Sequence, residues 1–247
     1  VGSNEKFSGI AAQALTASDA TITVGNANTL SGATTGKVTA TVATGSLATL
    51  NGLSAAAQPA NGDAFALTLN DTSVDAGDLA TLDSKVDQAG GGSINMNTVV
   101  KLTGTLTEAQ TFITTKDNFT NNSNVVDIDL SGTIGDAAAV DTLSTDIRAL
   151  SGGTAEINLT GVTAISGTFA QLETIIDDSG AVGSNSKFSG VAAQTLTEDS
   201  GGTISVANAN KLSGATTGKV TATIATGSLT TLNGLSAAAQ PANGDAF

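Results

Sequence analysis

The sequence predicts an α/β repeat protein, namely an elongated right-handed solenoid whose coils of about 30 residues each hold a short parallel β-strand and a short helix. Three observations lead to this fold class: a long internal repeat, evenly spaced strand-like segments, and a helix-start motif between them. Residues 33–65 return as residues 215–247 with only two substitutions, at an offset of 182 positions. Because both stretches close on the same phenylalanine, we expect the chain to be a window of a longer repeat series.

The strand-like segments are triplets in which an apolar residue stands between two polar residues. Alternation of this kind turns one face of a strand to a core and the other to water. Successive triplets lie 27 to 34 residues apart, so six coils fill the 182-residue offset. The triplets are Lys6–Ser8, Thr39–Thr41, Thr68–Asn70, Asn95–Asn97, Asp127–Asp129, Glu156–Asn158, Lys187–Ser189 and Thr221–Thr223.

A second motif follows most triplets: a glycine, then Ser, Thr or Asp, then apolar residues three or four positions apart. The spacing is helical, and the hydroxyl or carboxylate can cap the first free N–H groups, so each motif predicts a short helix. The coils of Phe7 and Phe188 lack it, and the alternating residues 20–24 and 202–206 predict a second strand in place of the helix there. If the motifs formed strands instead, the fold would be a pure parallel β-helix. The motifs occupy residues 45–53, 77–86, 104–112, 135–143, 167–175 and 227–235.

The predicted domain organisation is one continuous solenoid over residues 1–247. It holds about eight coils and a six-coil super-repeat, in which residues 1–65 (the first copy) recur as residues 182–247 (the second copy). Gly, Asn, Asp and Ser gather at the joints between coils, where they allow tight turns. The period runs through these joints without a break, so none of them predicts a domain linker.

The composition excludes several classes of function. Twenty-two acidic against nine basic residues give a net charge of −13, which repels nucleic acids and anionic lipid surfaces. No apolar stretch reaches the length of a membrane span, so we expect no membrane insertion. Cysteine and histidine are absent. The usual activating base of a serine nucleophile and the usual zinc ligands are therefore missing, and we predict no enzymatic activity.

The outward-facing polar residues form the most function-like feature. They predict either a solvated face with side-chain ladders or a ligand face that takes a glycan. Acidic residues on neighbouring rungs and in two loops are candidates for Ca²⁺, which takes oxygen ligands, although no EF-hand or Gly-Gly-x-Gly-x-Asp motif is present. Solvated acidic loops are the alternative, and no apolar segment beside the rungs would keep one carboxyl protonated for a glycosidase-like pair. The candidates are Asp127, Asp129, Glu156, Asp117, Asp177 and Asp178.

Three phrases carry a resemblance to a known group of proteins: residues 74–79 (VDAGDL), 102–105 (LTGT) and 165–168 (ISGT). They resemble the degenerate repeats of giant surface proteins of marine cyanobacteria and other bacteria. The resemblance implies an extracellular or cell-surface adhesin, sheath, surface-layer or filament protein, and it brings no catalytic residues.

The leading hypothesis is therefore a non-enzymatic extracellular structural module. Its expected partners are further copies, end to end or laterally, or neighbouring repeats of the same chain. The alternative is an adhesin stalk that binds calcium or a glycan.

Overall fold

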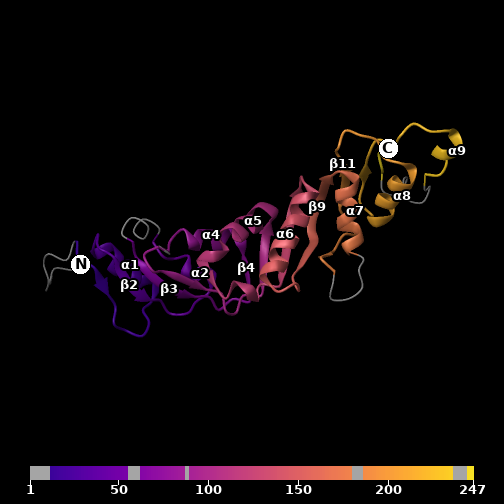
Figure 1. The fold of residues 1–247 in the computed structure, drawn as a ribbon. Helices are drawn as coiled ribbons and strands as arrows, with labels where there is room; N and C mark the ends of the chain where they lie inside the picture. The colour runs from indigo at the N-terminus through magenta and orange to yellow at the C-terminus, as the bar shows by residue number, and fades with distance from the viewer. Residues whose placement is uncertain (1–11, 55–61, 87–88, 180–185, 236–243) are drawn as a thin grey trace. The chain divides into compact units, whose positions relative to one another are not determined.

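Short parallel strands alternate with helices in the computed structural model, which describes residues 12–54, 62–86, 89–179, 186–235 and 244–247. The predicted strand at Lys6–Ser8 lies outside these ranges. The chain divides into two units, one of residues 1–102 with 111–124 and one of residues 103–110 with 125–247. We describe each unit by itself (Figure 1).

The first unit holds a five-stranded sheet of order β1-β2-β3-β5-β7, and all four neighbouring pairs are parallel. Strand β6 (Lys101–Thr105) and helix α5 (Leu106–Thr115) contain the boundary between the units. The other elements are β1 (Leu15–Thr16), α1 (Val24–Ala33), β2 (Val38–Thr41), α2 (Leu47–Leu50), β3 (Ala64–Thr68), β4 (Ser73–Asp75), α4 (Ala76–Asp83), β5 (Ser93–Asn95), the 3-10 turns η1 (Lys116–Asn118) and η2 (Asn122–Asn124), and β7 (Phe119–Thr120).

In the second unit the strand order is β12-β11-β9-β8-β6, and β10 also pairs with β9. The β8–β9, β9–β11, β9–β10 and β11–β12 pairs are parallel. Helix α6 packs against β9 and against α7, and α7 in turn contacts α8 (Figure 1). The elements are β8 (Asp127–Ile134), α6 (Ala137–Leu150), β9 (Glu156–Gly167), α7 (Phe169–Ser179), β10 (Phe188–Ser189), β11 (Thr195–Glu198), α8 (Val206–Ala215), β12 (Val220–Thr221) and α9 (Leu229–Leu232).

Each predicted Gly-Ser/Thr/Asp motif lies at the start of a helix. The motif's own hydroxyl or carboxylate caps α2, α6 and α9, whereas α4 begins at Ala76, ahead of its motif, and is capped by Asp75. Ser46 accepts a hydrogen bond from the N–H of Thr49 at the start of α2, and its counterpart in the second copy does the same for α9. Thr105 and Glu108 form a reciprocal capping box at the start of α5. The backbone and hydroxyl hydrogen bonds of Thr105 lower the pKa of the Glu108 carboxyl. The alternative of a pure parallel β-helix is wrong, because these segments form helices.

The prediction that a second strand replaces the helix in one coil is also wrong. Helices α1 and α8 fill those positions, capped by Thr23 and Ser205, and the preceding alternating residues form only single bridges to the next coil. These two helices carry few large apolar residues, because small side chains such as Ala27 and Ser31 face their core. The apolar residues Val24, Ala27 and Leu30 do have helical spacing, but no glycine precedes the capping Thr23, so the motif that revealed the other helices is absent.

Apolar side chains from the strands and from the helices together form the core of each unit. In the second unit, Ile128 and Ile157 are paired in register and fully buried. Leu143 and Leu172 cover this side from α6 and α7. The predicted division into inward apolar and outward polar residues is confirmed at these strands.

Candidate functional site

Outward-facing polar side chains on neighbouring strands, or directly after them, bond to one another. Asp129 stands opposite Asn158, whose side-chain amide donates to Asp129 Oδ1 over 3.1 Å. In the first unit, Asn121 donates in the same way to Asn95 Oδ1 over 2.8 Å. These contacts are the side-chain ladders expected of a solvated sheet face.

The six candidate calcium ligands lie in different surroundings. Asp127 stands in register with Glu156 on the outward face of β8 and β9. Asp117 lies 3.6 Å from the ammonium group of Lys116. Across the part of the chain that the structure describes, no group of three or more Asp or Glu side chains gathers where it could hold a metal ion. Calcium binding stays a prediction.

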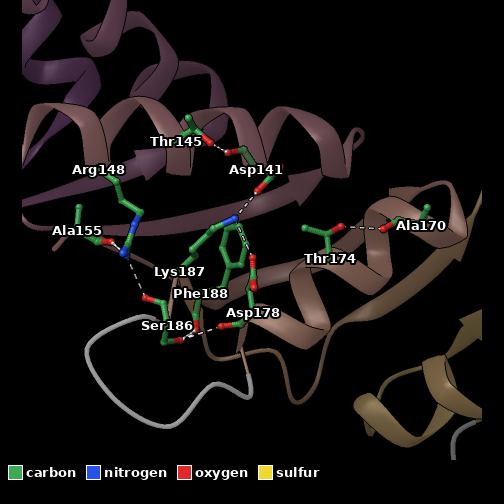
Figure 2. A network of polar contacts seen from close by, with 10 residues as sticks. All are labelled: Asp141, Thr145, Arg148, Ala155, Ala170, Thr174, Asp178, Ser186, Lys187 and Phe188. Atoms are coloured by element: carbon green, nitrogen blue, oxygen red, sulfur yellow. Dashed lines mark hydrogen bonds and ion pairs between the residues drawn. The ribbon is translucent and has the colours of Figure 1, made fainter. Parts of the chain in front are cut away.

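The remaining two candidates, Asp177 and Asp178, belong to ion pairs at the end of α7. Asp178 lies 2.9 Å from Lys187 Nζ, which also lies 3.5 Å from Asp141 on α6 (Figure 2). The hydrogen bond to Asp178 is the main cause that raises the pKa of Lys187, against a smaller opposing effect of burial. A lysine held in this way stays protonated at neutral pH. It can fix position, but it cannot act there as a nucleophile or a general base.

The same network holds the chain that enters β10. Arg148 donates to the carbonyl of Ala155 over 2.9 Å and to that of Ser186 over 3.4 Å (Figure 2). The Ser186 hydroxyl reaches the carbonyl oxygens of Asp178 and Phe188. Phe188 is fully buried. The cationic side chains of this cluster therefore anchor the point where one coil passes to the next.

A second lysine links α8 to α7. Lys211 Nζ lies 2.7 Å from a carboxylate oxygen of Glu173 and 2.8 Å from one of Asp177. Hydrogen bonds to Asp177 and then to Glu173 raise the pKa of Lys211. The first copy has Thr29 at this position, so the ion pair belongs to the second copy alone.

A serine–aspartate clamp recurs in both copies and was not singled out from the sequence. The Ser31 hydroxyl and the Val38 N–H donate to the two carboxylate oxygens of Asp63, over 2.5 and 2.7 Å, and this carboxylate is fully buried. The signal that could have found it is an aspartate that directly precedes β3 in the first copy and the bridging residue Ala246 in the second, together with a serine inside a helix. The equivalent residues of the second copy are Ser213, Val220 and Asp245.

Two hollows lie on these surfaces. One, of about 200 Å³, is lined by residues of α6 and α7. Its one acidic side chain, Asp141, lies beside Lys187. The other, of about 430 Å³, is formed by β1 and α1 and has the apolar side chains of Leu15, Ile22 and Leu30 in its lining.

Comparison with known proteins gives no relative: no family model, no curated protein and no solved structure matches the chain. None of the helices in the described ranges has the length and apolar character needed to cross a membrane.

Proposed function

We propose that the chain is a non-enzymatic structural module of a large extracellular surface, sheath or filament protein. Its coils continue one another as a right-handed solenoid, and its task is to extend and space. The observation that carries this proposal is the repeat itself, because two nearly identical sequences form the same coil with the same caps and the same Ser–Asp clamp.

The long-range side-chain contacts support a structural role, because they link each coil to the next. Asn28 donates to the carbonyl of Gly52, 24 positions away, and Asn51 to that of Asp78, 27 positions away. In repeat arrays such nearest-neighbour ties distribute stability along the whole array. A chain with this design gains length without needing a specialised site.

Extension of the chain in phase tests the solenoid and the spacing function together. Because Phe247 corresponds to Phe65, appending a second set of residues 66–247 after Phe247 continues the period. We expect a higher melting temperature and a maximum dimension in small-angle X-ray scattering that grows by about 29 Å, at roughly 4.8 Å per coil. The control appends residues 80–247, which breaks the phase at similar composition. The same melting temperature and the same maximum dimension for the two extended chains would contradict the proposal.

Antibody labelling of the cells that produce the protein tests the extracellular location. Labelling of intact cells is the expected result. Labelling that requires permeabilised cells would contradict an extracellular module and would leave the fold unaffected.

A calcium- or glycan-binding stalk is the second candidate, and the register of Asp127 with Glu156 favours it. An ion that binds the folded state raises the melting temperature by mass action. We would compare melting in calcium and in chelator for the parent chain and for the double variant Asp127→Asn, Glu156→Gln. Overlapping curves for the parent would rule out calcium at this pair.

A further inference from the structure

The hollow of about 200 Å³ between α6 and α7 lies within the second unit, and the function proposed above makes no use of it. Its polar groups are Asp141 on α6 and Gln171 and Thr174 on α7, and Figure 2 shows Asp141 and Thr174. Its volume is below the ~300–1,000 Å³ of ordinary small-molecule pockets, so it suits one slender group. Methyl groups complete the lining, from Ala137, Ala138 and Ala170.

The next helix pair along the chain shows which side chain occupies the equivalent place there. Lys211 of α8 reaches across to α7, where its ammonium nitrogen lies 2.7 Å from a carboxylate oxygen of Glu173 and 2.8 Å from one of Asp177. A single lysine side chain therefore bridges these two neighbouring helices.

Thr174 and Lys211 stand at equivalent positions of their helices. Each is the sixth residue after the residue that caps the helix, which is Thr168 for α7 and Ser205 for α8. The same position carries threonine in α1, α4, α5 and α6, so among these six helices the lysine is particular to α8. The four threonines are Thr29, Thr81, Thr111 and Thr142.

Asp141 is in turn equivalent to Glu173, because each is the fifth residue after its helix cap. The α6–α7 pair thus keeps the carboxylate that receives the lysine in the α7–α8 pair, but it has the short Thr174 where that lysine would begin. The missing length of side chain accounts for the hollow. The other four helices have an uncharged residue at the fifth position, namely Asn28, Ala80, Gln110 and Asn210.

The polar groups of the hollow have acceptor capacity to spare. Lys187 Nζ lies 3.5 Å from Asp141 Oδ1 but 2.9 Å from Asp178, so Asp178 is its main partner. An ionised carboxylate offers about four lone-pair positions on its two oxygens. The Thr174 hydroxyl donates to the carbonyl of Ala170 over 3.0 Å, and its oxygen can still accept a hydrogen bond. An ammonium group, which has only donors, matches this set of acceptors.

We propose that the hollow between α6 and α7 binds the side chain of a lysine supplied by a partner protein. The alkyl chain of that lysine packs on the alanine methyl groups, and its ammonium group meets Asp141 and Thr174, as Lys211 meets Glu173 in the next helix pair. The net charge of −13 favours a basic partner. An arginine fits less well, because its guanidinium is a wide planar group rather than a compact charge.

An NMR titration of the isotopically labelled full chain with the peptide acetyl-Gly-Lys-Gly-amide tests the site. We expect saturable shifts of the backbone amide signals of Ala138, Ala170 and Thr174. The same peptide with norleucine in place of lysine keeps the alkyl chain but not the charge, and it should bind about tenfold more weakly or less. Equal binding of the two peptides, or shifts spread over acidic residues outside the hollow, would overturn the proposal.

Filling the hollow from within the chain gives a second test. Thr174→Lys places a lysine where α8 has Lys211, so it should lower the affinity for the lysine peptide by about tenfold or more, as loss of a charge-assisted hydrogen bond would. The matched control is Thr81→Lys, because Thr81 has the equivalent position on α4 and the same bond to a carbonyl four residues back. The control should bind the peptide like the parent chain, and equal losses in the two variants would contradict the site.

Removing the internal lysine should create a second site. Lys211→Thr opens the equivalent place between α7 and α8 and leaves Glu173 and Asp177 without their ammonium partner. We expect new shifts at these two residues on addition of the lysine peptide, and their absence would overturn the equivalence on which the proposal rests. Unchanged signals from the first unit report that the variant is folded. Binding at the hollow does not depend on the stacking of further coils, so failure of these titrations leaves the proposed function standing.

Discussion

The two copies of the repeat have the same local structure but different surroundings. The Ser–Asp hydrogen bond measures 2.5 Å in both copies. The side-chain amide of Asn28 donates to the carbonyl of Gly52 over 2.9 Å, and in the second copy Asn210 donates to the carbonyl of Gly234 over 2.8 Å. Burial, in contrast, differs at the same positions, as Leu50 and Leu232 show with exposed fractions of 0% and 37%. Local conformation follows the sequence of the coil, and the contribution of each side chain to stability follows its neighbours.

The largest expected difference between the copies is at the leucine that ends each short helix. Leu50→Ala should destabilise the protein by about 2–5 kcal/mol, because it opens a cavity in a fully buried site. Leu232→Ala should cost less than about 1 kcal/mol, because this side chain is already partly in water. Urea unfolding of both variants measures the contrast, and equal costs would mean that neighbouring coils do not determine the energetics.

The aspartate of the clamp gives the next contrast. Asp63→Ala removes the buried carboxylate that accepts hydrogen bonds from the Ser31 hydroxyl and the Val38 N–H, at a cost of about 3 kcal/mol. Asp245 is only half-buried, so water can replace the lost acceptor and Asp245→Ala should cost about 1 kcal/mol. The measurement is again urea unfolding. A larger cost for Asp245→Ala than for Asp63→Ala would contradict the expectation that the more deeply buried carboxylate contributes more to stability.

Gly36 precedes β2 and Gly218 precedes β12, and substituting each glycine tests how far the neighbouring backbone can shift in each copy. A methyl group on Gly218 would collide with the backbone carbonyl of Gln194, a residue that is 2% exposed and held by the carbonyl of Leu159. The same change at Gly36 meets Gln13, which is exposed and can shift. We expect Gly218→Ala to lower the melting temperature and Gly36→Ala to lower it less. The opposite order would show that the Gln13 segment is the more rigid of the two.

The smallest effect on stability is expected at Lys211. The substitution Lys211→Thr introduces the residue that the first copy has at this position, Thr29. The raised pKa of Lys211 means that its contribution is complete below the unfolded lysine pKa of about 10.4 and disappears as pH rises through the higher folded value. The variant should therefore melt slightly below the parent at neutral pH, and the two should converge at strongly alkaline pH and in high salt. A gap that persists in both conditions would mean that the ion pairs are not its cause.

Much of the local structure could be read from short-range chemistry. The Gly-Ser/Thr/Asp motifs located six of the helices, because a capping oxygen and apolar residues three or four apart act within one turn. The polar–apolar–polar triplets located the longer strands, including β8 and β9, because alternation sets which side chains face the core. Helix α1 was missed because no glycine precedes its capping Thr23, although Val24, Ala27 and Leu30 are three positions apart.

The polar cluster required the tertiary structure. Asp141, Asp178 and Lys187 belong to three different segments, and their partnership depends on the packing of α6 against α7. The acidic residues identified from the sequence as calcium candidates include Asp177 and Asp178, which the fold places beside lysines. Charge type is visible in a sequence, but three of these ion pairs join residues 34, 38 and 46 positions apart, so the packing of the helices sets the counter-charge.

The amino-acid order alone establishes that this protein is a repeating α/β chain, since caps, alternation and period are properties of neighbouring residues. Only the packed structure decides which of two equal leucines is buried, which aspartate is clamped and which lysine is paired. The physical reason is that these quantities depend on the strands and helices packed alongside, and those elements are distant in sequence.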